Sequence, residues 1–155
     1  MIISNLSPTA FTRHAVAIIH EAAARMNRHA PCEIVQYVPG AVRDDGAEAR
    51  RIAKRSVAAM LTAYAQTASA ATRAAMSEHG RPEDFARAMS RLTRGEAPED
   101  AIADRLLAEY AIAGTPEECL AQAAVYAEAG VTELAIALIG ERPADDIARL
   151  GRAIK

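Results

Sequence analysis

Tryptophan is absent from this chain, and aromatic residues make up only 4% of it. A stacking platform for single-stranded nucleic acid needs exposed aromatic rings, so this composition argues against that class of partner. The net charge of -2 is also too small to attract a phosphate backbone or an anionic membrane. The basic run at residues 50–55 (RRIAKR) lies beside Asp44 and Glu48, and mixed signs are typical of a solvated helix face. We therefore expect neither nucleic acid nor a membrane as a partner.

The chain is also poor in residues that mark redox, metal or secretory sites. Its two cysteines, Cys32 and Cys119, are far apart and belong to no CxxC pattern, and its four histidines lack metal-ligand spacing. No P-loop, GxGxxG or GxSxG motif occurs. The chain has neither a basic leader with a long apolar segment nor an apolar run of about 18 residues. These absences predict a cytoplasmic protein with reduced thiols and no metal site.

A helix followed by a strand is the clearest local pattern, and it occupies residues 114–139. Thr115 can cap the free backbone amides of the first helical turn, and Pro116 at the first helical position needs no hydrogen-bond donor. Gly130 can adopt the left-handed conformation that ends a helix. Residues 134–139 (LAIALI) form a continuous apolar run. Such a run is typical of a strand that is covered on both faces in a parallel sheet.

The rest of the sequence predicts further strands and helices in alternation. A strand end is expected at residues 1–3, and a second strand at residues 33–38 is followed by turn residues at Pro39-Gly40, with residues 41–42 as its extension. Asp44 and Asp45 are expected to form a turn and helix cap. Helices are expected at residues 7–28, 47–68, most of 68–94 with a break at 79–82, 98–107, and from 143 to the end.

This order of elements points to one α/β domain over residues 1–155. Alternating strands and helices favour parallel strands joined by right-handed crossovers. About three strands are too few to close a barrel, and the surplus helices lie between the second strand and the last. We therefore predict a partial TIM-type (β/α) barrel with two open strand edges, which must be covered by helices or paired with another chain.

Four sequence segments together resemble the C-terminal part of a known family. They are residues 4–8 (SNLSP), 37–50 (YVPGAVRDDGAEAR), 111–118 (AIAGTPEE) and 126–136 (YAEAGVTELAI), followed by a last helix that opens with proline and aspartate. In this order they are similar to the luciferase-like monooxygenases, the flavin-dependent and F420-dependent oxidoreductases related to bacterial luciferase. The resemblance covers nearly the whole chain, and it rests on the combination, because GTPEE alone is a generic helix start.

The resemblance implies the last three strands of a (β/α)8 barrel, which typically takes about 250 residues. In the family, much of the cofactor and substrate pockets comes from the first five strands. The chain would then be the C-terminal portion of an FMN- or F420-dependent oxidoreductase or monooxygenase. It would be inactive without a partner, either a second copy or a separately encoded N-terminal half. The alternative is a truncated module without a cofactor or enzymatic activity that acts in self-association or partner binding.

Ser4 and Asn5 are the candidate site residues, because they follow the first strand at the end where a parallel barrel binds ligands. The resemblance implies that they lie close to the cofactor, where a hydroxyl and an amide could contact a flavin ring edge or a phosphate. The alternative is that they form an ordinary strand exit and helix cap. Two interpretations are also open for Arg13 and His14 in the first helix: they could approach a ligand, or they could lie on the surface. The sequence assigns no catalytic residue.

Overall fold

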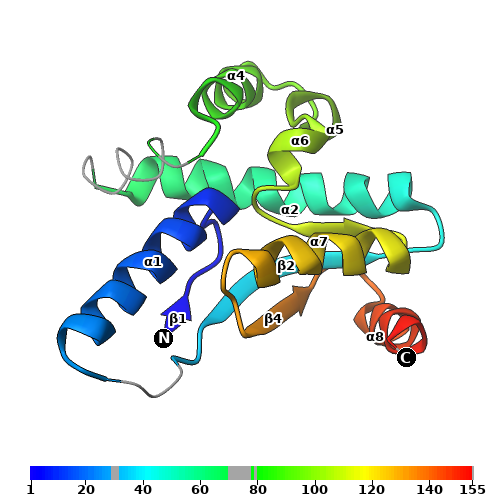
Figure 1. Ribbon diagram of the computed structural model, residues 1–155. Coiled ribbons are helices and arrows are strands. Elements are labelled where there is room, and N and C mark those ends of the chain that lie inside the picture. The colour runs from blue at the N-terminus through cyan, green and yellow to red at the C-terminus, as the bar shows by residue number, and fades with distance from the viewer. Residues whose placement is uncertain (29–31, 70–77, 79, 155) are drawn as a thin grey trace.

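The computed structural model describes residues 1–28, 32–69, 78 and 80–154 of the chain. Within these residues one parallel sheet contains β1 (Ile2–Ile3), β2 (Val35–Val42), β3 (Ile112–Gly114) and β4 (Glu133–Leu138). The helices are α1 (Thr9–Arg25), α2 (Gly46–Thr67), α4 (Pro82–Thr93), α5 (Pro98–Ala101), α6 (Asp104–Leu107), α7 (Pro116–Glu128) and α8 (Pro143–Ala153). Figure 1 shows α2 along one side of the strands and α8 beside the ends of β2 and β4. The parallel α/β arrangement agrees with the sequence prediction.

Strand β2 is the centre of the sheet, and its two edges are used differently. One edge pairs with all six residues of β4, from Val35 opposite Glu133 to Gly40 opposite Leu138. The other edge is shared by two short strands: β1 pairs with the start of β2, and β3 pairs with its end, from Gly40 to Val42. Strand β3 adds a fourth strand that the sequence pattern did not indicate, because three residues are too short to show a period.

The prediction of a turn at Pro39-Gly40 is wrong, because β2 continues through both residues to Val42. The amides of Val35 and Arg43 donate to Met1 and Gly114, so odd-numbered nitrogens face the edge shared by β1 and β3. Pro39 therefore directs its nitrogen into the gap between these two short strands, where it needs no hydrogen. A proline thus fits a central strand at this one place.

The helix and strand at residues 114–139 form as the sequence predicts. Thr115 and Glu118 make a capping box: the Thr115 hydroxyl accepts from the Glu118 amide at 3.3 Å, and the Glu118 carboxylate accepts from the Thr115 amide at 2.8 Å. After the C-cap Ala129, Gly130 has a φ of 92°, in the left-handed region that glycine adopts without strain. Local capping chemistry therefore sets both ends of α7.

Two of the predicted helices have different bounds in the structure. Helix α1 ends at Arg25 instead of about residue 28, and Asn27 then takes a φ of 53°. The single helix expected at residues 98–107 is two short helices, because the backbone is extended at Ile102. Ile102 is fully buried, so packing outweighs local helix propensity there. Part of the helix predicted over residues 68–94, and part of its break, lies outside the described residues.

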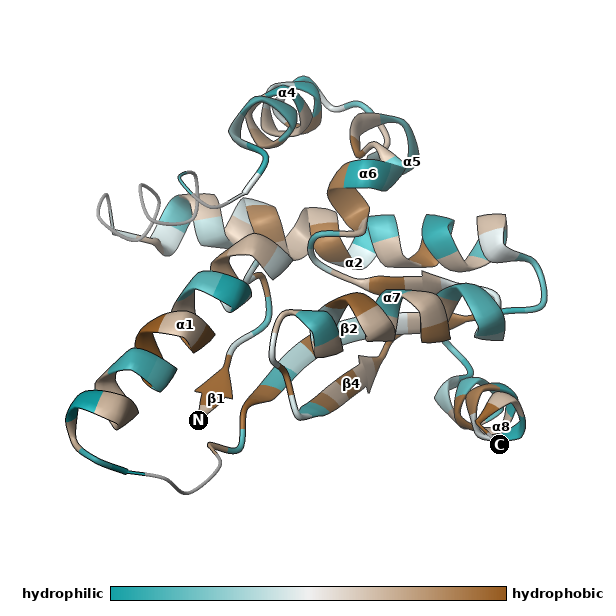
Figure 2. Ribbon diagram, viewed as in Figure 1, coloured by the Kyte–Doolittle hydropathy of each residue, from teal (hydrophilic) through white to brown (hydrophobic). Residues whose placement is uncertain are grey.

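The sheet is covered on both faces by apolar side chains. On one face Ala41 of β2 and Ala113 of β3 pack in a buried cluster with α2, whose alanines allow a close approach. On the other face Val38, Val42 and Ile112 pack with Cys119 and Tyr126 of α7. Figure 2 shows hydrophobic colour along the strands and hydrophilic colour on parts of every labelled helix. None of the helices in the described ranges could cross a membrane.

Candidate functional site

The predicted cofactor-binding residues Ser4 and Asn5 lie in a turn at the carboxyl end of β1. Both side chains are exposed, and the Ser4 hydroxyl donates to the Asn5 side-chain oxygen at 3.1 Å. Leu6 follows with a φ of 62°, so the turn needs a left-handed residue before the chain enters α1. A hydroxyl and an amide are thus presented together to solvent at the end of a parallel strand.

A buried pair of polar side chains positions this turn. Gln36, in β2, donates from its amide nitrogen to the Ser4 carbonyl at 3.0 Å, and its oxygen accepts from the Thr12 hydroxyl of α1 at 2.9 Å. Gln36 is 1% exposed and Thr12 is fully buried, and a buried polar group costs free energy unless it is hydrogen-bonded. Sequence reasoning missed both residues. A glutamine inside the apolar run of a strand was the available signal.

The alternative role of Ser4 and Asn5 as helix caps is not seen. Helix α1 has Pro8 at its N-cap position, and no side chain accepts a hydrogen bond there. Arg13 and His14 are exposed on α1, so the structure does not bring them into a pocket with the turn. The two residues that do cap a helix as expected are Thr115 and Asp45, whose carboxylate accepts from the Ala47 amide at 2.9 Å.

At the carboxyl end of β2, a buried ion pair joins the sheet to α8. Asp146, in the first turn of α8, accepts from Nη1 of Arg43 and, at 3.2 Å, from the backbone amide of Val42. The side chains of Arg43 and Asp146 are 4% and 0% exposed. Arg149 adds a contact of 3.8 Å to Asp146. A buried charge without its partner is very unfavourable, so this pair fixes α8 against the end of β2.

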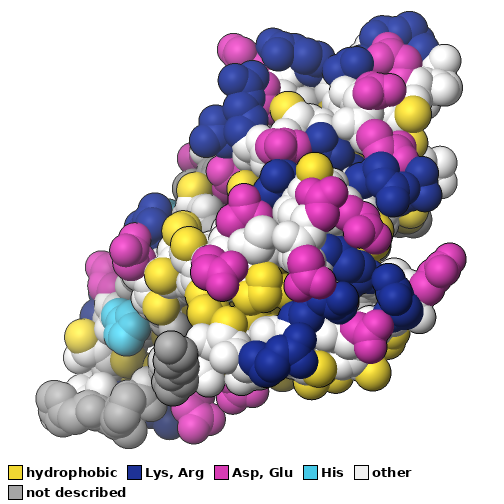
Figure 3. All heavy atoms as spheres, turned by 90° about the vertical axis from the view of Figure 1, so that its right-hand side faces the viewer, with side chains coloured by type: hydrophobic (Ala, Val, Ile, Leu, Met, Phe, Trp, Pro, Cys, Tyr) yellow, Lys and Arg dark blue, Asp and Glu magenta, His cyan; other side chains and the backbone are white. Residues whose placement is uncertain are grey.

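A hollow of about 610 Å³ lies beside this ion pair, between the end of β2, the start of α2 and the loop after β4. Its wall includes four arginines and two glutamates: Arg43, Arg51, Arg55, Arg142, Glu48 and Glu141. Figure 3 looks onto this side of the molecule and shows lysine and arginine side chains intermixed with acidic ones. The carboxyl ends of the strands thus carry a polar hollow in addition to the Ser4–Asn5 turn.

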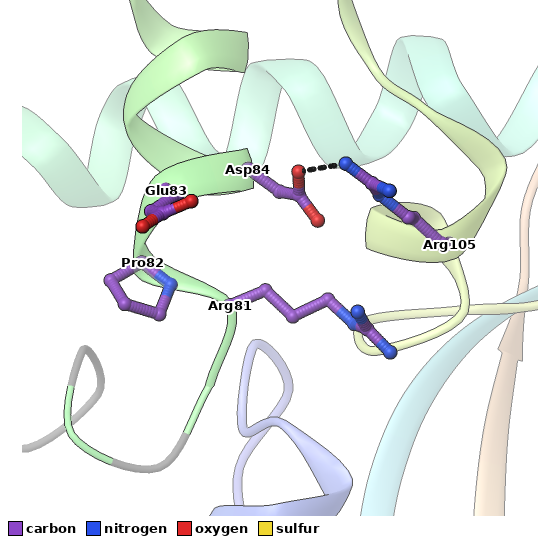
Figure 4. Close-up of a pocket in the computed structure, with 5 residues that line it drawn as sticks. All are labelled: Arg81, Pro82, Glu83, Asp84 and Arg105. Carbon is purple, nitrogen blue, oxygen red and sulfur yellow. Dashed lines mark hydrogen bonds and ion pairs between the residues drawn. The ribbon is translucent and has the colours of Figure 1, made fainter.

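A second hollow, of about 380 Å³, lies at the start of α4, away from the ends of β2 and β4. Figure 4 shows Asp84 directed toward Arg105, which donates to it at 2.5 Å. That hydrogen bond holds the pKa of the Asp84 carboxyl below its usual value. Arg81, in turn, contacts Glu109 at 3.1 Å. Three charged side chains of this hollow, Arg81, Asp84 and Arg105, are thus held in ion pairs, which is typical of a structural network.

The cysteines and histidines of the described residues do not form a reactive or metal-binding centre. Cys119 and Cys32 are free thiols, and burial raises the pKa of Cys119 to about 11. The Cys119 thiol is therefore protonated at neutral pH and a poor nucleophile. Within the described ranges no group of three or more histidine, cysteine, aspartate or glutamate side chains could hold a metal ion.

Comparison with known proteins places this arrangement in a family. A solved structure with a similar fold is the coenzyme F420-dependent tetrahydromethanopterin reductase from Methanopyrus kandleri, with a TM-score of 0.62 and 17% identity. The match covers 88% of this chain and 38% of the reductase, so the partial barrel predicted from the sequence is confirmed. No curated protein matches the chain. The model of the luciferase-like monooxygenases matches residues 1–133, and the chain belongs to this family.

Proposed function

We propose that the chain works in the cytoplasm as the C-terminal portion of a luciferase-like oxidoreductase or monooxygenase. Its strands complete a barrel with strands from another source, either a second copy or a separately encoded N-terminal half. The assembled barrel binds FMN or F420, and the chain alone is inactive. In such enzymes the cofactor carries the redox chemistry, and the protein binds and orients it.

The observation that carries this proposal is the position of Ser4 and Asn5. They lie at the carboxyl end of a parallel strand, the end at which (β/α) barrels bind ligands. Their side chains are exposed, and the buried Gln36 holds the Ser4 backbone in place. A hydroxyl and an amide fit a flavin or deazaflavin, because its ring edge and its phosphate offer oxygen and nitrogen acceptors. Ser4 and Asn5 would hold the cofactor from this side.

The open edge of β4 supports the need for further strands. Among the described residues β4 pairs only with β2, and none of its six residues is buried. An unpaired strand edge offers a row of backbone donors and acceptors to another strand. In a closed barrel this edge would pair with a further strand, which the described residues do not include.

Cofactor titration tests the proposal. The chain is titrated with FMN and with F420 while fluorescence is recorded, alone and with a candidate chain that carries the first five strands. We expect binding with the partner, and about tenfold weaker binding for the double variant Ser4→Ala/Asn5→Ala, because hydrogen bonds to the cofactor are lost. Ser90→Ala, at an exposed serine of α4, is the matched control and should bind as the parent does.

Failure of both cofactors to bind, with and without the partner, would reject the enzymatic proposal. The same open edge of β4 would then favour the second candidate function, a non-enzymatic module that associates with itself or with another protein. Sedimentation velocity then tests the module itself, which should form oligomers or a complex at tens of micromolar without a cofactor. A compact monomer that also fails to bind the partner would contradict both functions.

A further inference from the structure

Helix α8 carries an apolar surface that the rest of the described chain leaves uncovered. Its inner side packs against β2, β4 and α7, and Leu150 on that side joins a buried cluster. Ile147 and the C-cap residue Ile154, in contrast, are both 62% exposed. Seven residues make about two helical turns, so both isoleucines lie along one face. Figure 1 shows α8 at the margin of the molecule. Single exposed apolar side chains are normal, but an aligned pair is typical of a contact surface.

Small and large side chains alternate along this face of α8. The four exposed residues on it, which we call the outer face, are Ala144, Ile147, Gly151 and Ile154. The midpoint between Ile147 and Gly151 is position 149. The midpoint between Ala144 and Ile154 is the same position. When two such helices lie antiparallel about this centre, each isoleucine meets a small residue of the other helix. We propose that α8 pairs in this way with α8 of a second copy of this chain.

The two-fold symmetry of this pair makes every contact occur twice. Ile147 of one copy packs on Gly151 of the second copy, and Ile154 packs on Ala144 of the second copy. A Cβ added at Gly151 meets nothing within 4 Å, so the surface is open where Ile147 of the second copy arrives. Small residues let two helices approach closely, and the isoleucines then fill the space between them. The outer face is therefore complementary to itself in shape.

The charges beside the outer face are complementary about nearly the same centre. Asp145 and Arg152 are exposed and also lie seven residues apart, so they share one side of α8. Arg152 forms no ion pair with any residue that the structure describes, and Asp145 has only a contact of 3.7 Å, to Arg142. Antiparallel pairing brings Asp145 of each copy to Arg152 of the other, whereas parallel pairing in register would place like charges together. Charge therefore favours the antiparallel orientation.

The size of the outer face sets the strength of the pairing. Helix α8 has 11 residues and is therefore about 16 Å long. One face of such a helix is smaller than the roughly 800 Å² per partner that a standard interface buries. We therefore expect a weak, reversible dimer with a Kd of about 0.1 mM. The pairing uses no backbone group at the edge of β4, so it is independent of the barrel completion proposed above.

Sedimentation equilibrium of the full chain, from about 10 µM to about 1 mM, tests this inference. We expect a monomer–dimer equilibrium whose Kd rises at least about tenfold in Ile147→Asp, because a carboxylate would then be buried against Gly151 of the second copy. Ile18→Asp is the matched control, since Ile18 is a 50% exposed isoleucine of α1. The control should dimerise as the parent does.

Exchange of the two charges tests the orientation of the helices. Asp145→Arg and Arg152→Asp should each weaken the dimer about fivefold, because each places like charges opposite one another. An equimolar mixture of the two variants should dimerise as the parent does, since each variant then supplies the charge that the other lacks. A loss of helix stability within either variant would persist in the mixture, so recovery is specific to contact between copies.

Three results would overturn the inference: a parent that stays monomeric at about 1 mM, equal Kd values for Ile147→Asp and Ile18→Asp, or no recovery in the mixture. Association that Ile147→Asp leaves unchanged would assign the contact to another surface, such as the open edge of β4. Circular dichroism checks the fold of each variant, and the exposed position of Ile147 makes a retained fold the expected result. The test uses neither FMN nor F420, so its outcome is independent of the proposed oxidoreductase function.

Discussion

Strands β2 and β4 lie side by side and pair over six residues, but their surroundings differ. Six of the eight residues of β2 are buried, whereas none of the six residues of β4 is. Their sequences are similarly apolar, so composition does not explain the difference. β2 has strands on both edges, while β4 has one neighbour within the described residues. Burial in a parallel sheet is thus set by the neighbouring strands. The apolar sequence of β4 suits a strand that is paired on both edges.

The largest effect is expected at the buried ion pair that closes the end of β2. Asp146→Ala leaves Arg43 buried without its partner, which should lower the free energy of unfolding by about 3–5 kcal/mol. Urea unfolding followed by circular dichroism measures the change. Asp145→Ala is the control, because Asp145 is half exposed and 3.7 Å from Arg142, so its loss should cost less than about 1 kcal/mol.

Equal stability of Asp146→Ala and Asp145→Ala would show that the buried pair does not hold α8 against the sheet. In that case apolar contacts would hold α8 in place, since Leu150 packs against the buried cluster on one face of β2. Asp146→Asn separates charge from hydrogen bonding, since asparagine can still accept from the Val42 amide. We expect its stability to lie between those of Asp146→Ala and the parent.

The sequence predicts those parts of the fold that local chemistry determines. Helix α7 is bounded by Thr115 and Gly130, whose capping and left-handed conformation depend on a few neighbouring residues. Strand β3 and the continuation of β2 through Pro39 depend instead on strands distant in the sequence. No local pattern could show that Pro39 faces a gap between two other strands. The turn was therefore predicted where the chain in fact runs straight.

The candidate site likewise contains residues that the sequence indicates and residues that it does not. Ser4 and Asn5 could be selected from the sequence, because they directly follow an apolar strand end. Gln36, which holds their backbone, and the pair of Arg43 and Asp146 could not, since the partners are separated by 32 and 103 residues. A long-range hydrogen bond leaves no periodic trace in the sequence. Only the unexpected polar residue in a buried strand indicates that such a bond exists.

A direct comparison of the two strands comes from truncating one side chain in each. Val38→Ala in β2 removes a side chain that is 2% exposed and should cost about 2.5 kcal/mol, counting the cavity it leaves. Leu138→Ala in β4 removes a larger but half-buried side chain and should cost about 1 kcal/mol. Thermal unfolding of the isolated chain measures both. A cost at Leu138 equal to that at Val38 would mean that β4 is already covered in solution, as self-association would cause.

The contact between the two strands is tested by adding a single methyl group at Gly40. A Cβ there would meet Cγ2 of Ile136 in β4 at 2.4 Å and the Ile112 carbonyl oxygen at 3.3 Å. Gly40→Ala should therefore lower the free energy of unfolding by about 2 kcal/mol through overpacking.

Gly151→Ala is the control in α8, where an added Cβ meets nothing within 4 Å. It should stabilise by about 0.5–1 kcal/mol, because alanine favours a helix more than glycine does. Urea midpoints that shift in the same direction for both variants would contradict the close approach of β2 and β4. If only Gly40→Ala destabilises, β2 and β4 leave no space for a methyl group between them. The close packing of this pair then does not depend on a second neighbour for β4.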